Sequence, residues 1–378
     1  MFDAVRHLIA WTPLGLPAFL FVITVVVFFH ELGHFLVARA CGVKVDVFSV
    51  GFGKEIFGRT DKSGTRWKVS WLPIGGYVKF AGDANAASVP DHAAAARLSD
   101  AERAQCLTFK PLWQRAAVAA AGPAANFILG ILLFTGILFH EGHTVLEPII
   151  GGVVKGSAAE AAGFRPGDRV TAIDGAKITD FEQMPQIIAV SGGRNLTIDL
   201  VREGSPLSLH VMPRSTRMRD ALGDMGTNVV IGVHPSPTAS ITTENYSLPG
   251  AFGAACVETW NIMHTTVQGI SQMIRGYASA DQLRGPLGIM TMTRKVAVFG
   301  FMALLQLVAV LSVSIGLANL FPIPLLDGGH LLYYACEAVL GRPLGERAQD
   351  VGFRLGLVLV LGLVLLTTWN DLARLNFF

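Results

Sequence analysis

Five residues of this chain, His30-Glu31-Leu32-Gly33-His34, form an H-E-x-x-H pattern inside a long apolar segment. Two histidines four residues apart on a helix lie on the same face, one turn apart. That spacing lets both imidazoles bind one Zn²⁺, with the intervening glutamate placed as a general base. Because ionisable groups at membrane depth are costly, they usually mark function. The pattern therefore predicts a zinc site with His30 and His34 as ligands and Glu31 as the base.

A third ligand is expected, because a hydrolytic zinc usually binds three protein groups and a water. The segment 319–329 (NLFPIPLLDGG) offers one. Pro322 and Pro324 break the helix there, so carbonyl groups and a carboxylate can turn toward a cavity. Asp327 would then complete the site, and Asn319 would donate a hydrogen bond to a substrate carbonyl or a developing oxyanion. The competing interpretation is an ordinary helix end followed by a Pro and Asp-Gly turn.

The composition is that of a membrane protein. Hydrophobic residues make up 51% of the 378 residues, charged residues make up 15%, and the mean hydropathy is +0.48. A soluble protein of this length carries more charge. The four cysteines are scattered and form no C-x-x-C pattern, so neither a cysteine zinc site nor a disulfide framework is predicted.

Four segments are apolar enough to span a bilayer, which takes about 20 residues. They cover 14–38, 116–139, 299–321 and 351–369, and a shorter apolar stretch at 330–340 is predicted to be interfacial or partly buried. Residues 41–115 hold eleven Lys and Arg, whereas only Arg6 precedes the first span. The positive-inside rule therefore places 41–115 in the cytoplasm and both termini outside. The long 140–298 region then lies on the outer side.

A strand pattern follows the first span. Residues 67–80 (WKVSWLPIGGYVKF) predict two short strands around a Pro-Ile-Gly-Gly turn, forming a β-hairpin against the membrane. An extended substrate could add a strand to this hairpin by β-augmentation. A membrane-surface hairpin with no catalytic part is the alternative. Residues 83–105, which follow, predict a loop with a short surface helix.

The clearest soluble domain covers 148–214, where short strands, Pro-Gly and Asp-Gly turns and a short helix predict a small mixed sheet. Such a sheet can offer a strand edge and groove to an extended peptide. Residues 215–298 are expected to connect this domain to the third span. They predict a strand near 229–233, a helix over 250–277 and a turn at 285–289.

H-E-x-x-H in the first span and N-x-x-P-x-P-x-x-D-G in a later span resemble the site-2 protease family of intramembrane zinc metalloproteases, and most closely its bacterial RseP type. The resemblance covers nearly the whole chain. It includes GFGKEIFGR (51–59), GGYVKF (75–80), AGPAANF (121–127) and GPLGI (285–289). Residues 156–184 resemble a PDZ domain of the permuted bacterial type, present in one convincing copy.

The resemblance implies a polytopic α-helical membrane protein of about four transmembrane helices, with a membrane-associated β-hairpin and an inserted mixed α/β PDZ domain. Residues 1–147 would hold the first two spans and the hairpin, 148–214 the PDZ domain, 215–298 the connection, and 299–378 the last two spans. The implied metal ligands are His30, His34 and Asp327, and the implied catalytic residues are Glu31 and Asn319. The implied substrate-binding residues are Gly75, Gly76, Tyr77, Val78, Pro322 and Pro324.

The implied activity is that of an M50-like zinc metalloendopeptidase in the bacterial inner membrane. It would cut single-span membrane proteins within or near their transmembrane segments, as in regulated intramembrane proteolysis. The substrates that the resemblance implies are anti-sigma-factor-type proteins and signal-peptide remnants. Further partners would be the lipid bilayer and a peptide or periplasmic protein at the PDZ domain, but no nucleic acid. In the expected chemistry the pKa of zinc-bound water falls to about 7, and Glu31 moves its proton to the leaving amine.

Other interpretations stay open. A membrane-anchored zincin acting at the cytoplasmic face would take a Glu or His from outside the membrane as its third ligand. A metal transporter or a PDZ scaffold with an inactive site would have no need of Glu31. His140 and His143 are three residues apart rather than four, and they predict a solvated turn at the membrane surface. His330 either faces the metal and substrate or begins a partly buried helix.

Overall fold

The computed structural model describes residues 15–83, 98–219, 225–277 and 279–374. The chain divides into two compact units. The first comprises 1–134 and 285–369, and the second comprises 135–284 and 370–378. The N-terminal stretch with Arg6 and most of the loop expected at 83–105 lie outside the described residues.

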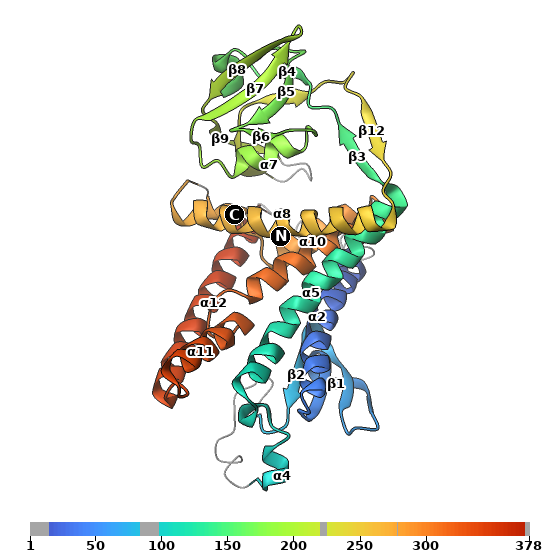
Figure 1. Ribbon diagram of the computed structural model, residues 1–378, viewed down its shortest axis with the longest axis vertical. Coiled ribbons are helices and arrows are strands. Elements are labelled where there is room, and N and C mark those ends of the chain that lie inside the picture. The colour runs from blue at the N-terminus through green and yellow to red at the C-terminus, as the bar shows by residue number, and fades with distance from the viewer. Residues whose placement is uncertain (1–14, 84–97, 220–224, 278, 375–378) are drawn as a thin grey trace, which may run out of the picture. The chain divides into compact units, whose positions relative to one another are not determined.

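Four helices in the described part of the chain are long and apolar enough to cross a membrane, as the sequence predicts (Figure 1). They are α2 (Gly15–Ala40), α5 (Leu112–Glu141), α10 (Phe301–Asn319) and α12 (Glu346–Arg374). Each helix carries exposed large apolar side chains, and most of those on α12 are exposed, as expected where lipid replaces water.

Helix α2 packs against α5 and α10 in the first unit. Its Val22 and Val26 are fully buried and contact Leu129 of α5 and Val308 of α10. At Gly33, inside the H-E-x-x-H pattern, a Cβ would overlap the carbonyl oxygen of Ala121 on α5. Glycine at this position therefore lets the two backbones approach closely, as small residues do between membrane helices.

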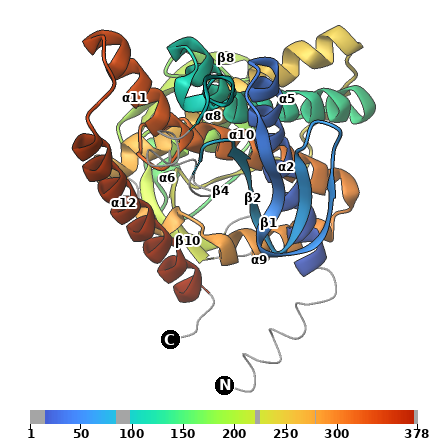
Figure 2. The same cartoon turned by 90° about the horizontal axis from the view of Figure 1, so that it is seen from below.

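A β-sheet lies beside α2 in the first unit (Figure 2). It is built from β1 (Val45–Thr60) and β2 (Arg66–Phe80), which pair antiparallel. Residues 45–50 of β1 pair with 76–80 on one edge and with 66–70 on the other, and 66–70 also pair with 55–60. The sheet therefore has four rows of backbone, and 76–80 form one of its outer edges.

The predicted hairpin within 67–80 is therefore wrong in its pairing. The two halves of this segment flank residues 45–50 instead of pairing with one another. The missing partner is the first half of β1, and nothing within 67–80 shows that this earlier segment lies between its two halves. Gly51 and Gly53, at φ +90° and +88°, let that strand bend where the pairing changes.

Two further helices of the first unit cover a predicted turn and a predicted short apolar stretch. The 285–289 segment was expected to be a turn, but it begins α9 (Pro286–Ala297), with proline in the first helical turn, where its missing N–H is tolerated. The apolar stretch at 330–340 belongs to α11 (Asp327–Leu340). Short segments α4 (Asp100–Arg103) and η1 (Leu107–Phe109) precede α5.

The second unit contains a four-stranded antiparallel sheet in the order β6-β5-β7-β8, with a single apolar core. Asp174-Gly175 joins β5 to β6 with both residues at positive φ, the turn that an Asp-Gly pair predicts. Val229 and Ile231 are buried in the same core although they lie beyond residue 214. The strands are β3 (His143–Leu146), β4 (Ile150–Val153), β5 (Arg169–Ile173), β6 (Ala176–Lys177), β7 (Leu196–Arg202), β8 (Ser205–Val211), β9 (Arg214–Arg219), β10 (Met225–Val230), β11 (Val233–Pro235) and β12 (Ile241–Glu244).

The helices of the second unit are α6 (Ala158–Ala162), α7 (Gln183–Ala189), η2 (Ala280–Gln282) and the long α8 (Leu248–Ile274), which is close to the helix predicted at 250–277 (Figure 1). The carboxylate of Asp168 is fully buried and accepts from Arg202 Nε at 2.7 Å and from the Arg165 N–H at 2.8 Å. Desolvation opposes the charge on Asp168, but these hydrogen bonds outweigh it and lower the pKa of the carboxyl group.

Candidate metal centre

His30, His34 and Asp327 meet although nearly 300 residues separate the last from the first two. One ligand atom from each lies within 4.8 Å of the others, and no other such group occurs in the described part of the chain. His30 Nε2 lies 3.1 Å from one carboxylate oxygen of Asp327, and His34 Nε2 lies 3.4 Å from the other. All three side chains are less than one-fifth exposed. Buried groups so arranged are costly unless a cation or proton joins them.

Helix α5 fixes how the His34 ring presents its nitrogens. The carbonyl oxygen of Val118 lies 2.8 Å from His34 Nδ1, so Nδ1 carries the proton and donates. The lone pair of Nε2 then faces the Asp327 carboxylate and is free for a metal. Such outer partners commonly set the tautomer and orientation of metal-binding histidines.

The same helix holds His30. The side-chain amide of Asn126 lies 3.2 Å from His30 Nδ1, and this asparagine is fully buried. With nitrogen toward His30, the amide oxygen has no hydrogen-bond partner. A half-turn of the amide places that oxygen against His30 Nδ1–H, so that the oxygen accepts a hydrogen bond from the imidazole. It also leaves the Nε2 lone pair free, as metal binding requires.

Glycine at position 122 gives the two imidazoles their space. A Cβ there would overlap His34 Nε2 and lie 2.8 Å from His30 Cε1. Gly122 and Asn126 belong to the AGPAANF segment and are four residues apart on α5. Their spacing on one helix face was visible in the sequence, but their partners were not.

Glu31 lies between the ligands and the sheet. The carboxylate accepts a hydrogen bond from the backbone N–H of Val78 on the outer edge formed by residues 76–80. A Cβ on Gly76 would lie 3.2 Å from Glu31 Cγ. Two residues predicted to bind substrate therefore touch the predicted general base.

The other residues predicted to bind substrate lie near these. Gly75 has φ +134°, a backbone conformation that side chains resist, and a Cβ there would lie 2.5 Å from the Phe52 ring. Tyr77 stacks on Phe52 with ring centroids 5.9 Å apart. Gly75 and Tyr77 therefore both pack against Phe52, which supports the outer edge formed by residues 76–80.

The loop before α11 presents Asp327 as the first residue of that helix. Asn319 is the half-buried last residue of α10, and Pro322 and Pro324 lie between the two helices. Leu325 has φ +104°, which is a strained conformation for a leucine and is typical of functional sites. His330 lies one turn after Asp327, with its ring 6.5 Å from that of Tyr334.

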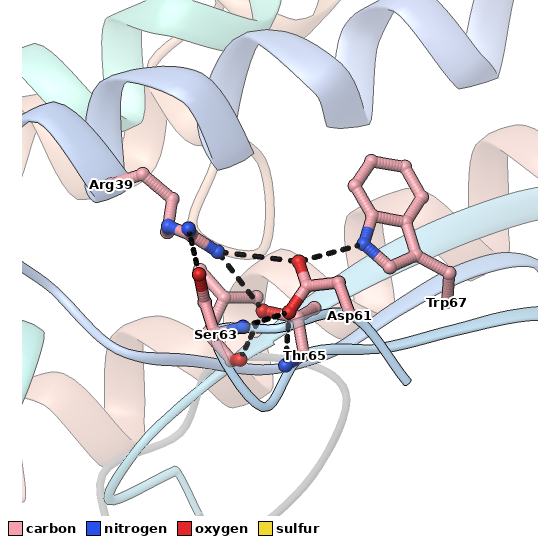
Figure 3. A network of polar contacts seen from close by, with 6 residues as sticks. Arg39, Asp61, Ser63, Thr65 and Trp67 are labelled. Atoms are coloured by element: carbon pink, nitrogen blue, oxygen red, sulfur yellow. Dashed lines mark hydrogen bonds and ion pairs between the residues drawn. The ribbon is translucent and has the colours of Figure 1, made fainter. Parts of the chain in front are cut away.

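A polar network fixes the sheet to the end of α2 (Figure 3). Arg39 donates to Ser63 Oγ at 2.6 Å and lies 3.5 Å from Asp61 Oδ2. Asp61 also accepts from the N–H groups of Ser63 and Thr65 and from the Trp67 indole at 3.2 Å. Desolvation opposes the charge on Asp61, but these hydrogen bonds outweigh it and lower the pKa of the carboxyl group.

Residues 18–363 match peptidase family M50, and the chain belongs to that family. It is 44% identical over 358 residues to a protein of Agrobacterium fabrum provisionally named a zinc metalloprotease, covering 94% of this chain and 95% of the relative. A similarly named protein of Rhizobium meliloti is 43% identical over 358 residues, covering 94% and 96%. Metalloprotease MmpA of Caulobacter vibrioides is 40% identical over 385 residues, covering 96% of each chain.

Membership of this family confirms the prediction of a metallopeptidase. The donor set of two buried imidazoles and a carboxylate fits the predicted zinc, which binds nitrogen and carboxylate oxygen in hydrolytic sites. Four apolar helices agree with an integral membrane enzyme. His140 and His143 lie at the end of α5 and the start of β3 and belong to no metal-binding group among the described residues.

Proposed function

We propose that this chain is an intramembrane zinc endopeptidase of the site-2 protease, RseP type, which hydrolyses peptide bonds in or near the transmembrane segments of single-span proteins. The observation that carries the proposal is the meeting of His30, His34 and Asp327 beside Glu31, with His30, Glu31 and His34 on an apolar helix. A hydrolytic site on such a helix has membrane-embedded peptide bonds within its reach.

His30, His34 and Asp327 would hold the zinc. When bound, the ion supplies an acidified water and a Lewis acid for the scissile carbonyl. Glu31 would accept the proton of that water and donate it to the leaving amine. Asn319 would donate a hydrogen bond to the developing oxyanion. Each of these roles requires the side chain to reach the reacting peptide bond.

A transmembrane substrate must unwind before attack, because a helix engages its own amide groups. The outer edge formed by residues 76–80 would bind the unwound segment as an added strand. The approach of Gly76 to Glu31 supports this, because a strand added there runs past the base. Pro322 and Pro324 would contact the same segment from the loop before α11.

The enzyme would lie in the bacterial inner membrane with 41–115 in the cytoplasm and the 148–214 domain in the periplasm. This domain would be a PDZ module that limits access by bulky ectodomains or binds a peptide. Its four-stranded sheet and α7 support such an assignment. The substrates would be anti-sigma-factor-type proteins or signal-peptide remnants in regulated intramembrane proteolysis.

The test is cleavage of a single-span reporter in proteoliposomes, with bound zinc measured in each preparation. Glu31→Gln should abolish cleavage and retain zinc, whereas Asp327→Ala should lose both. The matched control is Glu141→Gln, which alters the exposed glutamate of the H-E-G-H sequence and should change neither. Equal cleavage by wild type and Glu31→Gln would overturn the proposal and favour a transporter or scaffold.

A further inference from the structure

Arg115, in the first turn of α5, makes an ion pair, a hydrogen bond to a backbone carbonyl and a contact with an aromatic ring. Its guanidinium donates to both carboxylate oxygens of Glu337 on α11, at 2.9 and 2.5 Å. Its Nε donates to the carbonyl oxygen of Lys110 at 3.0 Å, and the group lies 5.1 Å from the ring centroid of Tyr334. Both charged side chains are only 15% exposed. The fork geometry fixes the orientation of the two helices as well as their separation.

Both partners of Arg115 on α11 belong to the helix that begins with Asp327. Tyr334 lies seven residues after Asp327 and therefore on the same face of the helix. Glu337 lies ten residues after it, roughly 15 Å along the axis at 1.5 Å per residue. A contact at this end controls where the other end of a rigid helix lies.

The other end of α11 is also closely packed. A Cβ on Gly328 would overlap the carbonyl oxygens of Leu320 and Phe321, and one on Gly329 would overlap that of Ile323. The first turn of α11 therefore rests directly on the backbone of the preceding loop. With the loop at one end and Arg115 at the other, α11 is held at two points.

Arg115 also belongs to a row of residues on α5. Val118, Gly122 and Asn126 follow it at spacings of three, four and four residues, which places all four on one helix face. Val118 and Asn126 contact the two histidine ligands, and Gly122 gives them space. One face of α5 therefore touches both ligand-bearing helices.

We propose that Arg115 is a positioning residue of the metal centre, acting through Glu337 to set the distance of Asp327 from His30 and His34. A buried ion pair is weak evidence for stability, because desolvation offsets the attraction. Its bidentate geometry instead supplies registry between α5 and α11. The inference rests on the proposed metal site but not on the proposed substrate or reaction.

The test measures zinc affinity of the full-length purified protein by competition with a chromogenic chelator. Arg115→Met should bind zinc about 2- to 30-fold more weakly, the usual size of effect for a residue that acts on a site through intervening contacts. Arg115→Lys should fall between, because an ammonium cannot make the bidentate contact. Exchange of the two charges in the double variant Arg115→Glu, Glu337→Arg should restore affinity to within a few-fold of wild type.

The matched control is Arg202→Met, which breaks a similar arginine–carboxylate pair with Asp168 in the second unit and should leave zinc affinity unchanged. Wild-type affinity in Arg115→Met overturns the inference, as does an equal loss in Arg202→Met. If Arg115→Met fails to fold, the double variant decides, and failure to restore affinity counts against the inference. Asp327→Ala tests the proposed metal site on which the inference rests. If its zinc affinity equals that of wild type, Asp327 is not a ligand and the metal site is wrong.

Discussion

His34 Nδ1 donates to the carbonyl oxygen of Val118 at 2.8 Å, and this hydrogen bond joins the helix of the H-E-x-x-H pattern to α5. Because the acceptor is a backbone atom, no side-chain substitution at 118 removes it. The contact depends instead on how closely α2 and α5 approach one another. The space between these helices is therefore the quantity that substitution at Gly122 changes.

Gly122→Ala should disrupt the metal centre. The added Cβ overlaps His34 Nε2 and lies 2.8 Å from His30 Cε1, so both ligands must move. We expect bound zinc and reporter cleavage to fall at least tenfold. The control is Gly136→Ala on the same helix, where a Cβ has no neighbour within 4 Å. Metal analysis of both purified variants checks the prediction, and normal zinc in Gly122→Ala would contradict it.

Asn126→Leu should weaken zinc binding by about 10- to 100-fold, because His30 Nδ1–H loses its acceptor in a fully buried position. Asn126→Asp keeps an acceptor there and should retain most of the affinity. Chelator competition distinguishes the two variants. Equal losses would show that position 126 matters for packing and not for the orientation of His30.

Asp61→Ala should reduce cleavage without loss of zinc. It removes the acceptor shared by Arg39, Trp67 and the 63–65 turn, so the sheet edge shifts relative to Glu31. We expect a decrease of about tenfold or more, since small displacements of reacting groups are costly. Glu55→Gln is the control on the same sheet, because the side chains of the Glu55–Arg66 pair are 32% and 43% exposed and ion pairs open to solvent contribute little. Cleavage kinetics and zinc analysis of the purified variants check the prediction. A fall in the zinc content of Asp61→Ala would contradict it.

The Asp168–Arg202 pair should make the second unit sensitive to acid. Because the pKa of Asp168 is lower folded than unfolded, its stabilisation is fully present above the unfolded pKa near 4. It is lost as pH falls through the folded-state pKa. At neutral pH, Asp168→Asn should lower the free energy of opening of β5 and β7 by about 3 kcal/mol. Hydrogen exchange between pH 7 and 3 should show this difference shrinking only below about 4, and a constant difference would contradict the assignment.

Much of the metal centre was predictable from residue types. Two histidines at helical spacing and an aspartate after a proline-broken span were sufficient to predict the three side chains that the structure brings together, because few polar groups occur at membrane depth. Apolar length was likewise sufficient for the four spans. These signals lie within short stretches of sequence.

What the sequence did not predict depends on contacts between distant segments. Residues 66–70 and 76–80 both carry strand patterns, but nothing local shows that each pairs with 45–50 and not with the other. The acceptor for His34 is a backbone carbonyl, which leaves no trace in residue types. The Arg115–Glu337 pair spans 222 positions and resembles any two charges near the ends of helices.

Gly33 has a consequence for how the enzyme can be dissected. A close approach of α2 to α5 lies between the two histidines, inside the five-residue pattern itself. An isolated peptide with the sequence of α2 would carry the whole pattern but neither the acceptor for His34 nor the neighbour of His30. The H-E-x-x-H pattern is thus local in sequence, whereas the orientation of its two imidazoles requires α2 and α5 to cross.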